Sequence, residues 1–122
     1  MNWSAIAAIL LGLGVGLGAF GAHGLKTRLD AYSMGIWEKA VLYHFFHALG
    51  LLIVSILPRV QAVSQSTTDT ICGLLVIGII LFSGSLYALA LTGAPTLGAI
   101  TPVGGVAFLA AWFLLAWRLI RH

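Results

Sequence analysis

Two histidines three residues apart, His44 and His47, are the residues of this sequence whose types and spacing could most readily do chemistry. Residues three apart on a helix project from neighbouring positions on one face, so both imidazoles would point the same way. Imidazole exchanges protons near neutral pH and also suits Zn, Cu or Fe. Ser83 and Ser85 place two hydroxyls close together further along the chain. The three carboxylates, in contrast, lie at the edges of apolar stretches: Asp30, Glu38 and Asp69.

The composition determines what surrounds these side chains. Of the 122 residues, 61% are hydrophobic and only 7% are charged. Soluble domains carry about 25% charged residues, so the composition excludes an ordinary water-soluble globule, and its hydrophobicity excludes disorder. A formal charge of +3 is too small for a nucleic-acid-binding surface. The single Cys72 lies in an apolar stretch, which favours a small buried hydrophobic residue over a reactive thiol.

Four apolar stretches approach the roughly 20 residues that a membrane-spanning helix requires. We therefore predict an all-α membrane protein, a bundle of four transmembrane helices in one domain. The expected spans cover residues 3–23, 37–57, 71–91 and 102–119. The first stretch lacks a basic segment before it and is too long for a signal peptide, so we expect a retained helix.

Polar and helix-breaking residues predict where these helices begin and end. Asp30 or Ser33 is expected to cap the second helix, and Pro58 to end it. The Ser-, Thr- and Gln-rich residues 58–70 are expected to form an exposed loop. Thr101 before Pro102 predicts a cap followed by proline in the first turn of the fourth helix.

Glycines predict where helices come close. The first helix holds two interleaved pairs spaced four residues apart, Gly12/Gly16 and Gly14/Gly18. Such pairs let another backbone approach closely in lipid. Packing inside the bundle is the expected use, with a seam between two copies of the chain as the alternative. Close approach is also expected at three glycines of the third and fourth helices: Gly84, Gly104 and Gly105.

Counting residues along the predicted helices gives the depth of each polar side chain. At a rise of about 1.5 Å per residue, His44 lies about 10 Å and His47 about 15 Å below Trp37. The serines of the third helix return to similar depths, whereas the half nearer the termini holds few polar groups. Because an unpaired polar group is costly in hydrocarbon, we expect these side chains to face one another or a wet cleft. The predicted pocket, open to the connector at residues 25–30, comprises His23, Glu38, Tyr43, His44, His47, Ser83, Ser85 and Thr101.

The basic residues are divided equally between the two faces. Lys26, Arg28 and Lys39 lie on the connector side, and three arginines lie on the side of the termini. Lys26 and Arg28 directly follow the first helix, which favours a cytoplasmic connector and periplasmic termini. Anchoring at the membrane interface is the expected role of the connector-side residues.

Five segments resemble motifs of the YgdD-like family of small bacterial inner-membrane proteins, a domain-of-unknown-function family (423). They are GAFGAHGL at 18–25, AVLYHFFHAL at 40–49, FSGSL at 82–86, LTG at 91–93 and ITPVGG at 100–105. The similarity runs in order along nearly the whole chain. It implies a multispan protein of the bacterial inner membrane with a eukaryotic counterpart. No activity is established for that family, so the resemblance transfers no catalytic residue.

Three functional classes remain open. The favoured one is a membrane-embedded binding or scaffold protein that contacts the lipid bilayer, another membrane protein or a second copy through the glycine-rich helix. The alternatives are a small homo-oligomeric transporter of solute or coupled to protons, and a metal or haem protein. His23, His44 and His47 are weak metal ligands as a set, because His23 lies about 10 Å above His44. We expect no enzyme and no cofactor, since Ser83 and Ser85 lack an evident base. Structural hydrogen bonds from the histidines to Ser83, Ser85 or a backbone carbonyl are the expected alternative to ligand binding.

Overall fold

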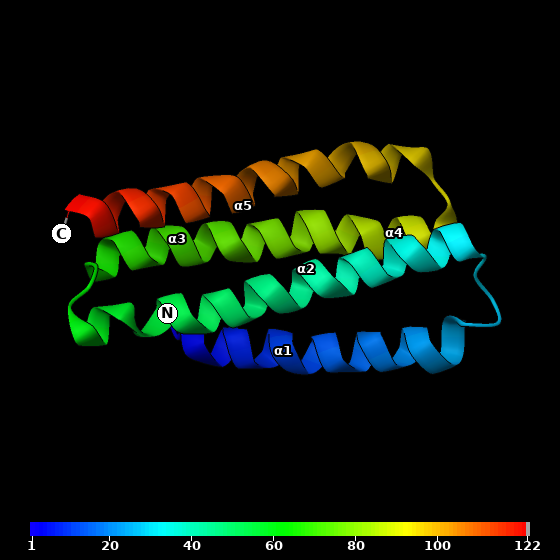
Figure 1. Cartoon of the computed structure of the whole chain (residues 1–122), viewed down its shortest axis with the longest axis horizontal. Coiled ribbons are helices and arrows are strands. Elements are labelled where there is room, and N and C mark those ends of the chain that lie inside the picture. Colours follow the sequence, from blue (N-terminus) through cyan, green and yellow to red (C-terminus); the bar gives the residue numbers. More distant parts are fainter. Residues whose placement is uncertain (122) are drawn as a thin grey trace.

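A computed structural model describes residues 1–121, and helices dominate this range (Figure 1). Four helical segments are long and apolar enough to cross a membrane, which confirms the predicted all-α architecture. They comprise α1 (Trp3–Phe20) with the π-helical η1 (Gly21–Leu25); α2 (Ala31–Ile56) with the 3-10 turn η2 (Leu57–Val60); α3 (Gln65–Gly78), the π-helical η3 (Ile79–Ser83) and α4 (Gly84–Thr92); and α5 (Pro95–Arg121).

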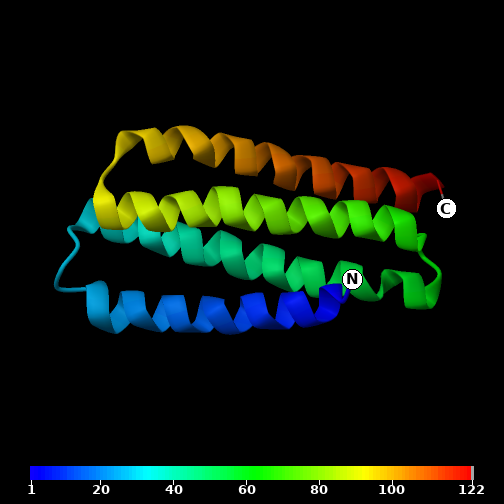
Figure 2. The same ribbon diagram turned by 180° about the vertical axis from the view of Figure 1, so that it is seen from behind.

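The helices run antiparallel in the order in which they follow along the chain. Helix α1 packs on α2, α2 packs on the α3–η3–α4 segment, and α5 packs on the other side of that segment. The first and last residues described lie at one end with the α2–α3 turn (Figures 1 and 2). The connector before α2 and the α4–α5 turn lie at the other end, called the connector end below. Helices α1 and α5 are therefore the outer helices and leave broad apolar faces open.

The helices are longer than the predicted spans because polar residues cap and extend them. Asp30 caps α2 as predicted, with its carboxylate accepting a 2.8 Å hydrogen bond from the Ser33 backbone N–H. Helix α3 begins at Gln65, inside the expected loop of residues 58–70. Ser64 caps it by accepting from the Thr67 N–H at 3.2 Å. The prediction of a loop throughout 58–70 was wrong because this cap starts a helix within a polar segment.

The predicted start of the fourth helix was also wrong. Helix α5 begins at Pro95, directly after the turn in which Gly93 adopts a positive φ of 69°. Pro102 consequently lies inside the helix rather than in its first turn. Proline suits the first helical position, and Pro95 takes that position instead. Thr101 is no cap; its hydroxyl bonds back to the Leu97 carbonyl at 3.4 Å.

Helix α1 and the following η1 contact α2 through glycines. A Cβ on Gly21 would overlap the Trp37 indole, and one on Gly14 would lie only 3.1 Å from the Phe45 ring. The Gly14/Gly18 pair thus serves packing within the chain. Gly12 and Gly16 face open space, as does Gly84, for which close approach was wrongly predicted. At Gly104 the prediction is confirmed, because a Cβ there would overlap the Phe82 backbone.

An apolar core fills the half of the molecule nearer the termini. Its largest fully buried side chains come from α2 and α3 and include Leu51, Ile71, Cys72 and Leu75. The burial of Cys72 agrees with its interpretation as a small hydrophobic residue. The polar cluster and the clefts are therefore the candidates for a functional site.

Candidate functional site

His44 joins three helices through both of its ring nitrogens. Its Nε2 lies 2.6 Å from the Leu10 carbonyl oxygen in α1, and its Nδ1 lies 2.8 Å from the Tyr87 hydroxyl in α4. A carbonyl only accepts, so Nε2 carries the proton and donates it. In the neutral ring Nδ1 then accepts from the Tyr87 O–H. His44 therefore has its hydrogen-bonding capacity satisfied by the protein.

His47 uses only one ring nitrogen. Its Nδ1 donates a 2.8 Å hydrogen bond to the Tyr43 carbonyl one turn earlier in α2. The ring stacks on Phe108 of α5, with centroids 3.5 Å apart and planes inclined by 13°. Within residues 1–121 its Nε2 makes no hydrogen bond. Because every fully buried polar side-chain atom in that range has a partner, this nitrogen lies at an accessible surface. His47 lines a cleft of about 360 Å³ together with Leu42, Tyr43, Phe46 and Trp112.

The buried hydroxyls hold neighbouring helices together. Ser83 is fully buried and donates to the Ala40 carbonyl of α2 at 2.8 Å. Ser85 of α4 shares a 2.6 Å hydrogen bond with Thr101 of α5. The two histidines bond to backbone carbonyls, which is one of the expected structural pairings. Their described hydrogen bonds include neither Ser83 nor Ser85. These hydroxyls stabilise the packing of neighbouring helices.

His23 and Glu38 lie apart from this cluster. Both are exposed, and Tyr43 is 37% exposed. The eight predicted residues therefore do not line one polar pocket. Depth counting carries no information on the direction in which each side chain points around its helix. Pairwise hydrogen bonds between neighbouring helices instead involve His44, Ser83, Ser85 and Thr101.

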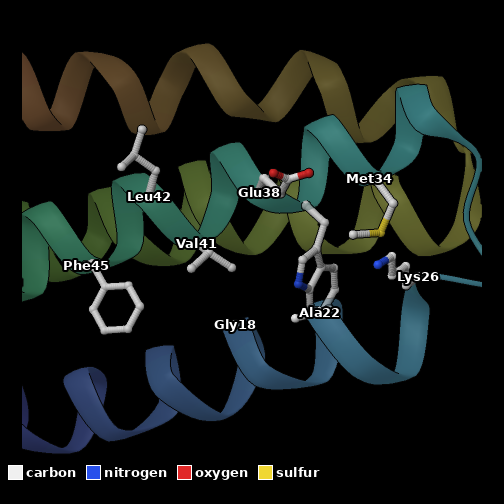
Figure 3. Close-up of a pocket in the computed structure, with 10 residues that line it drawn as sticks. Gly18, Ala22, Lys26, Met34, Glu38, Val41, Leu42 and Phe45 are labelled. Atoms are coloured by element: carbon white, nitrogen blue, oxygen red, sulfur yellow. The ribbon is translucent and has the colours of Figure 1, made fainter.

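A larger groove lies between α1–η1 and α2 at the connector end (Figure 3). It has a volume of about 590 Å³. Its floor includes Trp37, whose indole N–H donates to the Leu17 carbonyl at 3.0 Å. The lining is mainly apolar, with Lys26 and Glu38 as its charged members: Gly18, Gly21, Ala22, Lys26, Met34, Trp37, Glu38, Val41, Leu42 and Phe45.

Sequence reasoning missed several partners of these residues. Tyr87 lies at the depth of the predicted pocket but was left out of it, and the Leu10 carbonyl belongs to the backbone, which residue types do not reveal. The half nearer the termini also holds polar contacts. Ser4 bonds Ser55 at 2.8 Å, and the Trp3 indole donates to Asp69 at 2.9 Å.

A metal centre would need several ligands close together. Over the part of the chain that the structure describes, no three His, Cys, Asp or Glu side chains form such a group. His23 lies in η1, whereas His44 and His47 lie in α2. The two inward histidines are the only members of the proposed ligand set on one helix segment, and one of them already bonds Leu10 and Tyr87.

Comparison with known proteins determines the family. Residues 17–105 match the family described as "Protein of unknown function (DUF423)". The chain belongs to this family. Its UPF0382 membrane protein relatives include YwdK of Bacillus subtilis (strain 168), 44% identical over 96% of this chain and 94% of the relative. A Staphylococcus epidermidis (strain ATCC 12228) relative is 48% identical over 84% of this chain and 82% of its own length. No solved structure matches the chain.

The family confirms the resemblance carried by the five sequence motifs. Its members are named as membrane proteins without a stated activity, which agrees with the four spanning segments. This chain is therefore a membrane protein of an uncharacterised family.

Proposed function

We propose that this protein is a non-enzymatic binding or scaffold protein that holds a phospholipid in the groove between α1–η1 and α2. The groove is the observation that carries the proposal, because it combines an apolar length with charge at one end. The polar cluster supports it less, since its hydroxyls and His44 already bond within the protein. The packed core of Leu51, Ile71 and Leu75 likewise gives a solute path through one copy little support.

The dimensions of the groove suit one acyl chain. From Met34 to Phe45 the α2 wall spans eleven residue steps, or about 16 Å at the rise of an α-helix. Figure 3 shows Val41 and Phe45 along this wall, with Met34 and Lys26 towards the connector end. The groove and the bulk bilayer are both apolar environments. An acyl chain therefore gains stability in the groove only if it packs better there than among other lipids.

The charges at the connector end suit a phospholipid headgroup. Lys26 comes from the segment after η1 and Glu38 from α2, and both line the groove. A phosphate would interact favourably with the Lys26 ammonium, and a headgroup amine with the Glu38 carboxylate. An aminophospholipid carries both groups. Arg28 and Lys39 add positive charge near the same end.

Filling the groove tests this function. In Ala22→Trp the indole occupies the groove, whereas in Ala19→Trp another exposed alanine, outside the groove lining, receives the same side chain. Native mass spectrometry of protein extracted in mild detergent counts the phospholipids that remain bound. We expect wild type and Ala19→Trp to retain one phospholipid and Ala22→Trp to lose it. Equal retention by the two tryptophan variants would refute the assignment.

The proposal includes an orientation in the bacterial inner membrane. With Lys26 and Arg28 following the first helix, the connector end faces the cytoplasm and the termini face the periplasm. The groove then opens at the cytoplasmic leaflet. A reporter fused after the C-terminus and active only in the periplasm should be active; activity of a cytoplasm-specific reporter at the same point would reverse the orientation.

A further inference from the structure

The cleft beside His47 contains a buried histidine with an unused ring nitrogen. The side chain is only 9% exposed, and its Nδ1–H is held by the Tyr43 carbonyl at 2.8 Å. In the neutral ring the proton on Nδ1 leaves Nε2 as a lone-pair acceptor. His47 lies close to the middle of the 30-residue segment Ala31–Val60, where bilayer hydrocarbon supplies no donor.

Two further polar groups line the same cleft. For neither the Tyr43 hydroxyl nor the Trp112 indole N–H does the structure of residues 1–121 give a hydrogen-bond partner. The cleft thus combines an acceptor with donors inside walls of aromatic rings. A few polar groups in a mainly apolar cleft are typical of small-molecule sites, and about 360 Å³ falls within their usual size.

The cleft is open towards the bilayer. Leu42 and Phe46 line it and are 53% and 67% exposed, on a surface of membrane-spanning helix α2. A ligand can therefore arrive from the hydrocarbon. No charged side chain lines the cleft as described, so an ionic solute finds no partner there.

We propose that this cleft binds a membrane-soluble molecule with a hydroxylated aromatic ring, of the quinol type, whose O–H donates to Nε2 of His47. The ring would pack on Phe46 and Trp112, because aromatic pairs gain stability beyond the area that they bury. Tyr43 lines the same cleft, and its hydroxyl would serve the second ring oxygen. This site is separate from the phospholipid groove, since the two share only Leu42 in their linings.

Ring-nitrogen NMR tests the proposed hydrogen bond directly. Protein with ¹⁵N-labelled histidine, in lipid nanodiscs, is titrated with decylhydroquinone and separately with its dimethyl ether, which has the same ring and tail but no O–H. We expect a saturable change in the His47 Nε2 signal with the hydroquinone and none with the ether. The signals of His44 and His23 should stay unchanged. Equal responses to both compounds, or no response to either, would overturn the proposal.

A matched pair of variants measures the contribution of the acceptor. His47→Phe keeps a ring to stack on Phe108 but removes the nitrogen, and His23→Phe makes the same change at an exposed histidine. We expect decylhydroquinone to bind His47→Phe about tenfold more weakly, since its O–H is left unpaired, and to bind His23→Phe as it binds wild type. Unchanged affinity in a folded His47→Phe variant would contradict the site. If that variant does not fold, the comparison of hydroquinone and ether in wild type decides.

Discussion

The Tyr87 hydroxyl lies 2.8 Å from Nδ1 of His44, so a side chain of α4 donates to one of α2 in the middle of the helical packing. The other ring nitrogen of His44 continues the contact to the Leu10 carbonyl of α1. Helices in lipid gain little from hydrophobic burial against one another, because the acyl chains are equally apolar. Hydrogen bonds of this kind and close packing at glycines therefore specify how the helices assemble.

Removing the Tyr87 hydroxyl should weaken this assembly. Tyr87→Phe leaves Nδ1 of His44 without its donor, and we expect a loss of about 1–2 kcal/mol in the free energy of unfolding. Unfolding in mixed micelles measures it. Tyr32→Phe is the control, since Tyr32 is 78% exposed and should shift stability by less than about 0.5 kcal/mol. Equal stability of the two variants would show that the His44–Tyr87 contact contributes nothing.

Adjacent glycines at the α5–η3 contact offer a matched test of close packing. A Cβ on Gly104 would overlap the backbone of Phe82, whereas one on Gly105 would lie 3.8 Å from the Phe82 ring. We expect Gly104→Ala to destabilise the fold by about 1–3 kcal/mol because the helices must separate. Gly105→Ala should be neutral or slightly stabilising, since alanine favours a helix over glycine. Similar effects of the two changes would contradict the observed contact.

The cap of α2 predicts a dependence of stability on pH. The Ser33 backbone N–H, followed by its side chain, lowers the pKa of Asp30 below its usual range. Because the folded-state pKa is the lower one, the ionised cap stabilises the fold above the pKa of the unfolded state. That contribution is lost as pH falls through the folded-state pKa.

Two variants isolate this effect. Asp30→Ala should lower the unfolding midpoint at neutral pH, and its difference from wild type should shrink in acid. Asp30→Ser keeps a capping oxygen without a titrating group, so its stability should lack that acid-dependent component. Thermal scans from neutral to acidic pH measure both. A constant difference between wild type and Asp30→Ala across that range would exclude the charged cap.

Composition and apolar length predicted four spanning helices because membrane insertion depends on those two properties. Capping chemistry predicted Asp30 correctly, but the same chemistry at Ser64 and Pro95 starts helices earlier than hydropathy alone indicates. Hydropathy marks the hydrocarbon-spanning part of a helix, whereas caps determine where its hydrogen bonding begins. The predicted loop of residues 58–70 and the predicted cap at Thr101 were wrong for this reason.

The candidate site was harder to predict because it depends on side-chain direction. Depth placed His44, His47, Ser83 and Ser85 in one layer, yet rotation about each helix axis sends them to different partners. His44 and His47 are three positions apart, but one contacts α1 and α4 and the other stacks on α5. The sequence pattern of glycines was similarly ambiguous: Gly14 packs on Phe45, whereas Gly12 faces open space.

The contrast between the two histidines is tested most directly by their tautomers. ¹⁵N NMR of histidine-labelled protein in ligand-free lipid nanodiscs reports which ring nitrogen carries the proton, with assignments from His23→Phe and His47→Phe. We predict opposite states: His44 protonated on Nε2, which donates to Leu10, and His47 protonated on Nδ1, which donates to Tyr43. The same tautomer in both residues, or a proton on Nε2 of His47, would contradict the account.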